Sequence, residues 1–303
     1  AISNRTGTLH VADSVFQWNS SDSGGAIATT GSVSVTGSSF IENTAIGGTN
    51  EWCEDNELKE RNHITAEGQG GAIFASGSAR ITDSIFSSNR SSRGGAVHCH
   101  GTLEIYNSRF EGNQANGEEV ENEEAEPAGF GGALFAEGEL IVTNTVFHDN
   151  EAMIGGALTV IGDQDSSVVS NSVFHANTGT QWEDAEWLWE FEGTAAVVYS
   201  SPNQGIPTFA NCIFWDNTAE TGVILEGDVL IANSVVQADA DAGVDIESDP
   251  LFVDAGVGDF HLRPGSPCID AANGTAAPEL DADGLPRADD PDCRQAALPR
   301  GGR

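Results

Sequence analysis

Residues 94–113 read GGAVHCHGTLEIYNSRFEGN, and the same pattern returns along most of the chain. It has two halves, a Gly-Gly-Ala-aliphatic step and, sixteen positions after its first glycine, Phe-x-x-Asn. The first half also begins at Gly24, Gly70, Gly131 and Gly155, and the second at Phe16, Phe40, Phe86, Phe147, Phe174 and Phe214. A repeat of about 20 to 50 residues built from short strands and glycine turns indicates a solenoid, because each unit needs a neighbour to bury its apolar side.

Alternating segments between the two halves indicate the architecture. In residues 103–106 and 140–143, every second side chain is apolar, as in a strand with one face indoors. No stretch shows a helical period. We therefore predict an all-β fold, a right-handed parallel β-helix (solenoid) of about eight coils over residues 1–237. Glycines should take positive φ at the corners, and the recurring asparagines should stack there as a ladder.

Residues 238–303 are predicted to form an irregular C-terminal capping segment and tail. Acidic turns and little alternation set this stretch apart from the repeats. Its expected role is to cover the open edge of the last coil, because an uncovered parallel sheet invites further strand addition.

The two repeated motifs resemble those of chlamydial polymorphic outer-membrane proteins, over roughly residues 8–236. Residues 249–252 (DPLF), 258–262 (GDFHL) and 264–270 (PGSPCID) are similar to the closing segment of many secreted bacterial β-helix proteins. The resemblance implies surface display, adhesion or extracellular structure, and less often catalysis on polysaccharides. We therefore expect a secreted or cell-surface protein.

The charge is strongly one-sided, with 12 basic and 47 acidic residues and a net charge of −35. Such a chain repels nucleic acid, anionic membrane surfaces and polyanionic substrates, whereas cations and basic surfaces remain as partners. No run of eighteen apolar residues predicts membrane insertion. Because the sequence opens at Ala1 without a signal peptide, we expect a mature or excised exported fragment.

The spacing between the repeats reveals insertions. Four residues separate Asn19, Asn89 and Asn150 from the next glycine pair, whereas 26 follow Asn43 and 17 follow Asn113. Sixteen separate Asn177 from a weaker copy of the motif that begins at Thr194. Long loops at 44–69, 114–130 and 178–193 should therefore leave the same corner of alternate coils, about 10 Å apart. Long loops on a rigid scaffold often carry binding.

The chemistry of these loops supports two interpretations. They hold six, six and five acidic residues and the tryptophans Trp52, Trp182, Trp187 and Trp189. They form either a solvated fringe whose aromatics tuck back onto the coils, or a recognition surface. A recognition surface would bind Ca²⁺ through carboxylates, or a protein or glycan through exposed tryptophan, with Phe74 and Phe135 beside the slot between loops.

A second candidate site lies in that slot. Strand alternation turns His98 and His100 outward, and Glu137 aligns with them in the next coil. Two histidines and a carboxylate can hold a transition metal. Two plain surface histidines are the alternative.

The five cysteines suggest different roles. Cys268 and Cys293 lie in the irregular tail, where a disulfide would stabilise the end of the solenoid. Cys99 and Cys212 align with inward positions and are predicted to be buried thiols, while Cys53 has no obvious partner.

Three functions remain open. The favoured one is an extracellular binding or structural module, adhesin-like, with its contacts on the acidic loops. A polysaccharide lyase would need basic groups near the sugar carboxylate, and a glycoside hydrolase two spaced carboxylates; neither motif is recognisable here. The third is a subunit of an extracellular fibre that associates end to end, with the residue 1–10 end buried by another copy.

Overall fold

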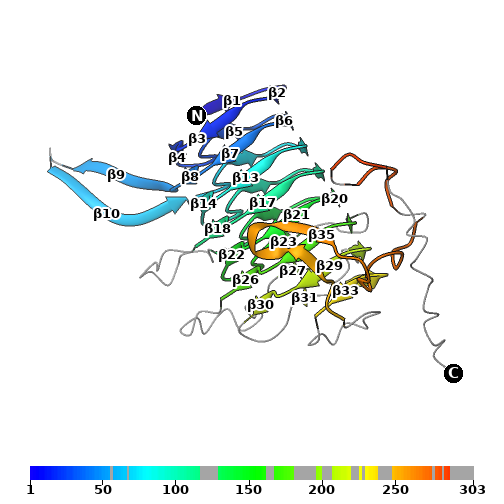
Figure 1. The fold of residues 1–303 in the computed structure, drawn as a ribbon. Helices are drawn as coiled ribbons and strands as arrows, with labels where there is room; N and C mark the ends of the chain where they lie inside the picture. Colours follow the sequence, from blue (N-terminus) through cyan, green and yellow to red (C-terminus); the bar gives the residue numbers. More distant parts are fainter. Residues whose placement is uncertain are drawn as a thin grey trace.

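The computed structural model describes residues 1–54, 57–66, 68–116, 129–161, 167–180, 196–199, 207–219, 225–226, 229–237, 248–274, 277–281 and 283–286. Within these ranges nearly all regular structure is β, apart from the short 3-10 helix η1 (Ala255–Val257). Four sheets, named A to D here, run the length of a rod (Figure 1).

Sheets A and B each contain eight strands. In sheet A these are β1 (Ile2–Asn4), β5 (Ile27–Thr29), β11 (Ile73–Ala75), β15 (Val97–Cys99), β19 (Leu134–Ala136), β23 (Leu158–Ile161), β27 (Ala196–Tyr199) and β31 (Leu225–Glu226). In sheet B they are β2 (Thr8–Ala12), β6 (Ser32–Thr36), β12 (Ala79–Thr82), β16 (Leu103–Tyr106), β20 (Leu140–Thr143), β24 (Val168–Ser170), β28 (Thr208–Ala210) and β32 (Leu230–Ala232).

Sheet C has eight strands and sheet D seven short ones. In sheet C these are β3 (Val15–Gln17), β7 (Ser39–Ile41), β13 (Ile85–Ser87), β17 (Arg109–Glu111), β21 (Val146–His148), β25 (Val173–His175), β29 (Ile213–Trp215) and β33 (Val235–Val236). In sheet D they are β4 (Ser20–Ser21), β8 (Thr44–Ala45), β14 (Arg90–Ser91), β18 (Gln114–Ala115), β22 (Glu151–Ala152), β26 (Thr178–Gly179) and β30 (Thr218–Ala219).

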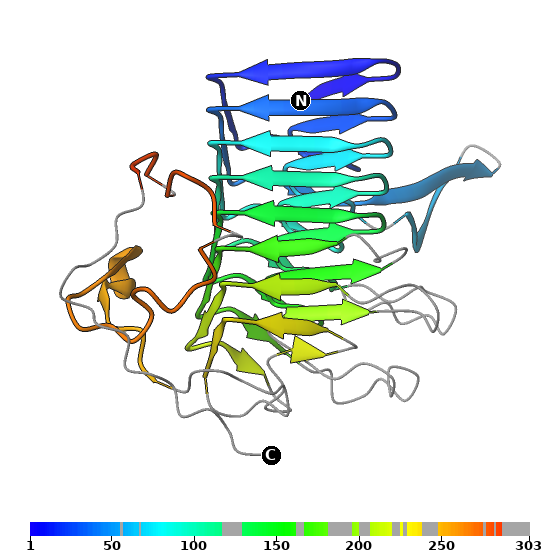
Figure 2. The ribbon, with the colours of Figure 1, turned by 90° about the vertical axis from the view of Figure 1, so that its right-hand side faces the viewer.

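Each strand pairs in parallel with the equivalent strand of the next coil. In sheet C, for example, Phe86 pairs with Phe40 on one side and Phe110 on the other. The chain thus visits A, B, C and D in turn and returns one coil further along, as the stacked strands of Figure 2 show. The predicted right-handed parallel β-helix of eight coils is confirmed.

A column of phenylalanines fills the interior behind sheet C. The rings stack nearly parallel, with centroids 4.6 to 5.3 Å apart, which is close to the strand spacing. The column comprises Phe16, Phe40, Phe86, Phe110, Phe147, Phe174 and Phe214. Aliphatic side chains from sheets A and B complete the core.

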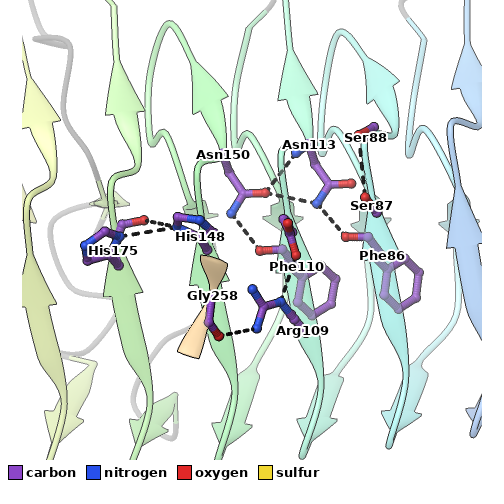
Figure 3. Close-up of polar contacts among 11 residues, drawn as sticks. Phe86, Ser87, Ser88, Arg109, Phe110, Asn113, His148, Asn150, His175 and Gly258 are labelled. Atoms are coloured by element: carbon purple, nitrogen blue, oxygen red, sulfur yellow. Dashed lines mark hydrogen bonds and ion pairs between the residues drawn. The ribbon is translucent and has the colours of Figure 1, made fainter. Parts of the chain in front are cut away.

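A second column, of asparagines, satisfies the backbone at the corner between sheets C and D. The amide of Asn113 donates from Nδ2 to Asn150 Oδ1 (2.9 Å) and to the carbonyl of Phe86 (3.0 Å), while its backbone N–H donates to the same Asn150 oxygen (3.0 Å). Figure 3 shows this repeating arrangement. The fully buried asparagines Asn43, Asn89, Asn113, Asn150 and Asn177 all take part in this ladder. Buried amides need such partners, so the Asn of Phe-x-x-Asn is structural, as predicted.

The glycine pairs turn the corner between sheets D and A. Gly70 has φ +62°, which a glycine adopts without strain. The second glycine is required by space, since a Cβ on Gly71 would lie 2.0 Å from the carbonyl oxygen of Gly95. The other corner, from sheet B to C, uses left-handed asparagines at Asn107, Asn144, Asn171, Asn211 and Asn233, with φ between 48° and 55°.

The first insertion is a long hairpin and not the loop predicted from residues 44–69. Strands β9 (Gly48–Glu54) and β10 (Glu57–Ala66) pair antiparallel and project sideways from the rod (Figure 1). The pairing satisfies the backbone groups that face each other across the hairpin.

The C-terminal arm, defined by the described residues between 248 and 286, packs along the side of the coils. It contains the antiparallel strands β34 (Phe252–Asp254) and β35 (Asp259–Leu262) around η1. Arg109 Nη1 donates to the carbonyl of Gly258 (2.9 Å), and Asn144 Nδ2 to that of Leu280 (3.1 Å). The expectation that residues 238–303 cover the edge of the last coil is therefore wrong for the described residues, whose contacts are lateral. Residues 238–247 and 287–303 lie outside the described part.

Candidate functional site

The three insertions leave one corner of the rod, between sheets D and A. The insertions follow β8, β18 and β26 of sheet D. The strands that alternate with these, β4, β14 and β22, lead into sheet A through the short corner. Figures 1 and 2 place the hairpin β9–β10 on the opposite side of the rod from the C-terminal arm. We call this corner and its three insertions the insertion edge; its described hairpin lies away from the arm.

The tryptophans of the insertion edge are only partly placed. Trp52 lies on β9, where it pairs with Lys59. Trp182, Trp187 and Trp189 fall in residues 181–195, which lie outside the described ranges, as do residues 117–128 of the second insertion. Their role in binding stays a prediction.

His98, His100 and Glu137 meet on the outer side of sheet A. His98 lies on β15, His100 directly after it, and Glu137 directly after β19, the next strand of the sheet. Glu137 Oε1 is 2.9 Å from His98 Nε2 and 3.5 Å from His100 Nε2. The three ligand atoms all lie within 4.8 Å of one another.

His98 is buried, contrary to the expectation that it is exposed like His100. Its ring packs edge-on between Phe74 and Phe135, with centroids 5.4 and 4.8 Å away. Its side chain has 0% exposure, against 38% for His100 and 32% for Glu137. The imidazole of His98 is thereby held in one place, with only its partners reaching the surface.

Phe135 must also be removed from the predicted contact surface. It is 3% exposed and belongs to a small apolar cluster with Phe130 and Ile154 on the outer side of sheet A. Phe74 is half-buried and remains a candidate contact residue.

The sequence contains the signal for this cluster. Ser23, Gln69, Arg93, Phe130 and Ile154 stand before successive glycine pairs and bridge to one another in the structure. In this column of corner positions, the residues are polar up to Arg93 and apolar at Phe130 and Ile154. An apolar residue at an outer corner predicts that the neighbouring sheet face is covered, which the alternation within the strand alone does not reveal.

The electrostatics of the site fix its protonation. Burial lowers the pKa of His98, and the charges of His100 and Arg93 add to this, although Glu137 opposes them. The hydrogen bond from His98 holds the pKa of Glu137 below its ordinary value despite partial burial. His98 is therefore neutral and Glu137 ionised near neutral pH, so His98 Nε2 carries the proton and donates to the carboxylate.

This assignment leaves the other ring nitrogen of His98 unsatisfied. Nδ1 is buried and has no hydrogen-bond partner within the described ranges. A buried polar atom without a partner costs about 1 to 3 kcal/mol. Such atoms are rare in folded proteins and call for an explanation.

A separate cleft of about 1090 Å³ lies between the C-terminal arm and the corner of sheets B and C. Its walls include Asp83 and Asn107 from the coils and Asp259, Asp281 and Asp283 from the arm. His261 bridges two of these carboxylates, with Nδ1 2.5 Å from Asp259 and Nε2 2.6 Å from Asp283. These hydrogen bonds raise the pKa of His261. Sequence reasoning missed this cleft because nothing in the repeats shows where the arm lies.

The cysteines correct one prediction. Cys268 is a free thiol, half-buried, so the predicted disulfide with Cys293 is not borne out, and Cys293 itself lies beyond the described residues. The thiol of Cys268 contacts Ser266, and burial raises its pKa. Cys99 and Cys212 are buried, as predicted, and burial raises their pKa values to about 11 and about 12.

Comparison with known proteins agrees with the architecture. A protein of Dictyostelium discoideum, the metabotropic glutamate receptor-like protein R, is 31% identical over 171 residues. That match covers 55% of this chain but only 9% of the relative. No solved structure matches the chain. No helix within the described ranges has the length and apolar character needed to span a membrane. The family of right-handed β-helix regions matches residues 4–250, and the chain therefore belongs to the right-handed β-helix family.

Proposed function

We propose that the chain is an extracellular or cell-surface binding module whose contact surface is the insertion edge. The observation that carries this proposal is the position of the hairpin β9–β10. It projects from the corner of sheets D and A, the same corner from which the other two insertions depart at alternate coils. A rigid rod that presents its longest segments along one edge has the usual design of a binding scaffold.

Charge and relatives support the same proposal. The insertions contribute 17 acidic residues, 6 from residues 44–69, 6 from 114–130 and 5 from 178–193. An edge of this charge favours a cationic or neutral partner, such as a basic protein surface or an uncharged glycan. The name of the Dictyostelium relative describes a receptor-like protein, which is compatible with display at a cell surface.

The test removes one insertion and keeps a strand of sheet D in its place. In the variant, residues 44–69 are replaced by residues 90–93, the four-residue corner of the next coil, whose strand β14 pairs with β8 in sheet D. The matched control replaces residues 90–93 by residues 20–23, so that one short corner substitutes for another. Affinity electrophoresis through neutral and acidic polysaccharides, with calcium or with chelator, measures retention, and a panel of immobilised basic proteins extends the search.

We expect the insertion variant, and the triple change of Trp182, Trp187 and Trp189 to Ala, to lose the retention that the control keeps. Retention that is equal in all of these proteins would contradict the insertion edge as contact surface. Release of sugar products instead of retention would favour the polysaccharide-degrading alternative.

A further inference from the structure

We propose that His98, His100 and Glu137 form a binding site for a divalent transition metal ion of the Zn²⁺ type. This inference goes beyond the proposed function, because it concerns an ion held on the face of sheet A and not a partner of the insertions. It rests on the separation of three ligand atoms, on their chemical type and on the burial of His98.

Two of the three ligand separations fit a metal ion, and all three ligand atoms lie within 4.8 Å of one another. Zinc lies about 2.0 to 2.2 Å from imidazole nitrogen and carboxylate oxygen, so two of its ligand atoms stand about 3.0 to 3.5 Å apart. Glu137 Oε1 is 2.9 Å from His98 Nε2 and 3.5 Å from His100 Nε2. The hydrogen bond between His98 and Glu137 would be replaced by two bonds to the ion, and the proton of His98 would move from Nε2 to Nδ1.

The ligand types select the class of metal. Two imidazoles and one carboxylate suit zinc and its neighbours in the first transition row. Calcium prefers six to eight oxygen ligands, which these three residues do not supply. The calcium expected from the acidic composition therefore does not belong at this position.

Burial prepares the site before the ion arrives. Phe74 and Phe135 hold the ring of His98 from both sides, and Cys99 and Ala136 continue the two strands into the core. Such an apolar shell limits the motion of the first ligand and excludes water around it.

Two features set the expected affinity. A ligating histidine usually donates its other ring N–H to an acceptor, and removing that partner costs about 10- to 100-fold in affinity. Within the described ranges no acceptor faces His98 Nδ1, so we expect moderate binding. Arg93 lies close enough for its charge to act on both His98 and Glu137, which opposes a cation. Replacing Arg93 by Gln should therefore tighten binding severalfold.

The experiment titrates the chelator-treated full chain with Zn²⁺ against a chromophoric chelator, in millimolar Ca²⁺ to occupy the acidic surface. Co²⁺ is added in parallel because its visible absorption reports imidazole and carboxylate coordination. The principal variants are His100→Gln and Glu137→Gln, whose side chains are partly exposed. The matched control is His10→Gln, an exposed histidine on β2 in sheet B.

We expect one Zn²⁺ per chain. The affinity should be at least about 100-fold weaker in both principal variants, because each loses a direct ligand. The His10→Gln control should bind Zn²⁺ as the wild-type chain does. Zinc should also raise the melting temperature of the wild-type chain and of the control, but not of the variants. Zinc binding that survives both principal variants, or that is absent from the wild-type chain, would overturn the proposal. The His98→Gln change removes a buried ring, so circular dichroism must first show that this variant is folded.

Discussion

The interior and the outer faces of the rod share one backbone but differ in how their residues repeat. Inside, each coil supplies a phenylalanine and an asparagine at fixed places, and neighbours of the same kind stack on them. Outside, sheet A carries His98 and Glu137 while sheet C carries His148 and His175 beneath the arm. Where side chains are enclosed, stacking demands the same residue in every coil, and at the exposed corner of Asn107 the left-handed backbone favours a repeated asparagine. The outer faces were free to acquire separate local contacts.

The largest expected effect is a break in the interior ladder. Asn113→Ala removes the acceptor for the backbone N–H and the amide of Asn89, and the donor to Phe86 O. Three buried groups then each lose a hydrogen bond, although the amide of Asn89 keeps its bond to the carbonyl of Phe40. At about 1 kcal/mol for each lost bond, the free energy of unfolding should fall by about 3 kcal/mol. Urea unfolding followed by fluorescence and circular dichroism would measure it.

The control uses an asparagine of the other column. Asn107 sits at an exposed corner with φ 48°, where alanine loses side-chain contacts and adopts a strained backbone. We expect Asn107→Ala to cost about 1 to 2 kcal/mol. Equal losses in the two variants would contradict the distinction between enclosed and exposed columns.

A smaller effect is expected where the arm meets sheet C. Phe260 contacts both His148 and His175, with ring centroids 5.3 and 5.2 Å away. Phe260→Ala should weaken docking of the arm by about 1 to 3 kcal/mol, because the ring is partly buried. Hydrogen exchange in residues 248–274 should accelerate, while the coils stay protected. Val257→Ala, at a position that is 77% exposed in the same arm, should leave exchange unchanged.

The same contact should depend on pH. Burial, followed by the charge of His148, lowers the pKa of His175 below 6.5, although Asp149 and Asp216 oppose this. As pH falls below about 6.5, an unfolded or undocked chain takes up the proton more readily, so docking loses stability until the lowered pKa is passed. Exchange in the arm should therefore speed up in acid beyond the intrinsic change, and His175→Gln should remove that dependence. A profile that His175→Gln leaves unaltered would exclude His175 as its source.

The smallest effect is expected within the arm itself and has the opposite sign. Hydrogen bonds to Asp259 and Asp283 raise the pKa of the exposed His261. Its stabilisation is complete below pH 6.5 and is lost as pH rises through the raised pKa. Limited proteolysis after Arg263 should therefore increase mildly at alkaline pH in the wild-type chain. The His261→Gln variant should be cleaved equally at acidic and alkaline pH. Cleavage that still depends on pH in this variant would contradict a role of the His261 hydrogen bonds in stabilising the arm.

The sequence alone was sufficient to predict the interior of the coils. Gly70 and Gly71, Phe110 and Asn113 recur because stacking imposes them, and recurrence within one chain is visible without relatives. The strand pattern also brought His98, His100 and Glu137 to one face. It could not reveal that His98 is buried, because Phe74 and Phe135 of the neighbouring coils pack against its ring from both sides. Nor could it place the arm, whose contacts join residues such as Arg109 and Gly258 that no repeat relates.

The register of the coils has a consequence for how this chain can grow. Every coil presents the same edges to its neighbours, so a whole coil can be duplicated or deleted and the ladders will close again. One such step lengthens the rod by about 4.8 Å, the strand spacing. His98 and Glu137 come from consecutive coils. A coil added between β15 and β19 would therefore separate them, whereas a coil added elsewhere would leave their separation unchanged. A coil added among those that the arm contacts would likewise disturb the hydrogen bonds of Arg109, Asn144 and Asn211 to the arm. The length of the rod is therefore adjustable in units outside the coils that carry these two sets of contacts.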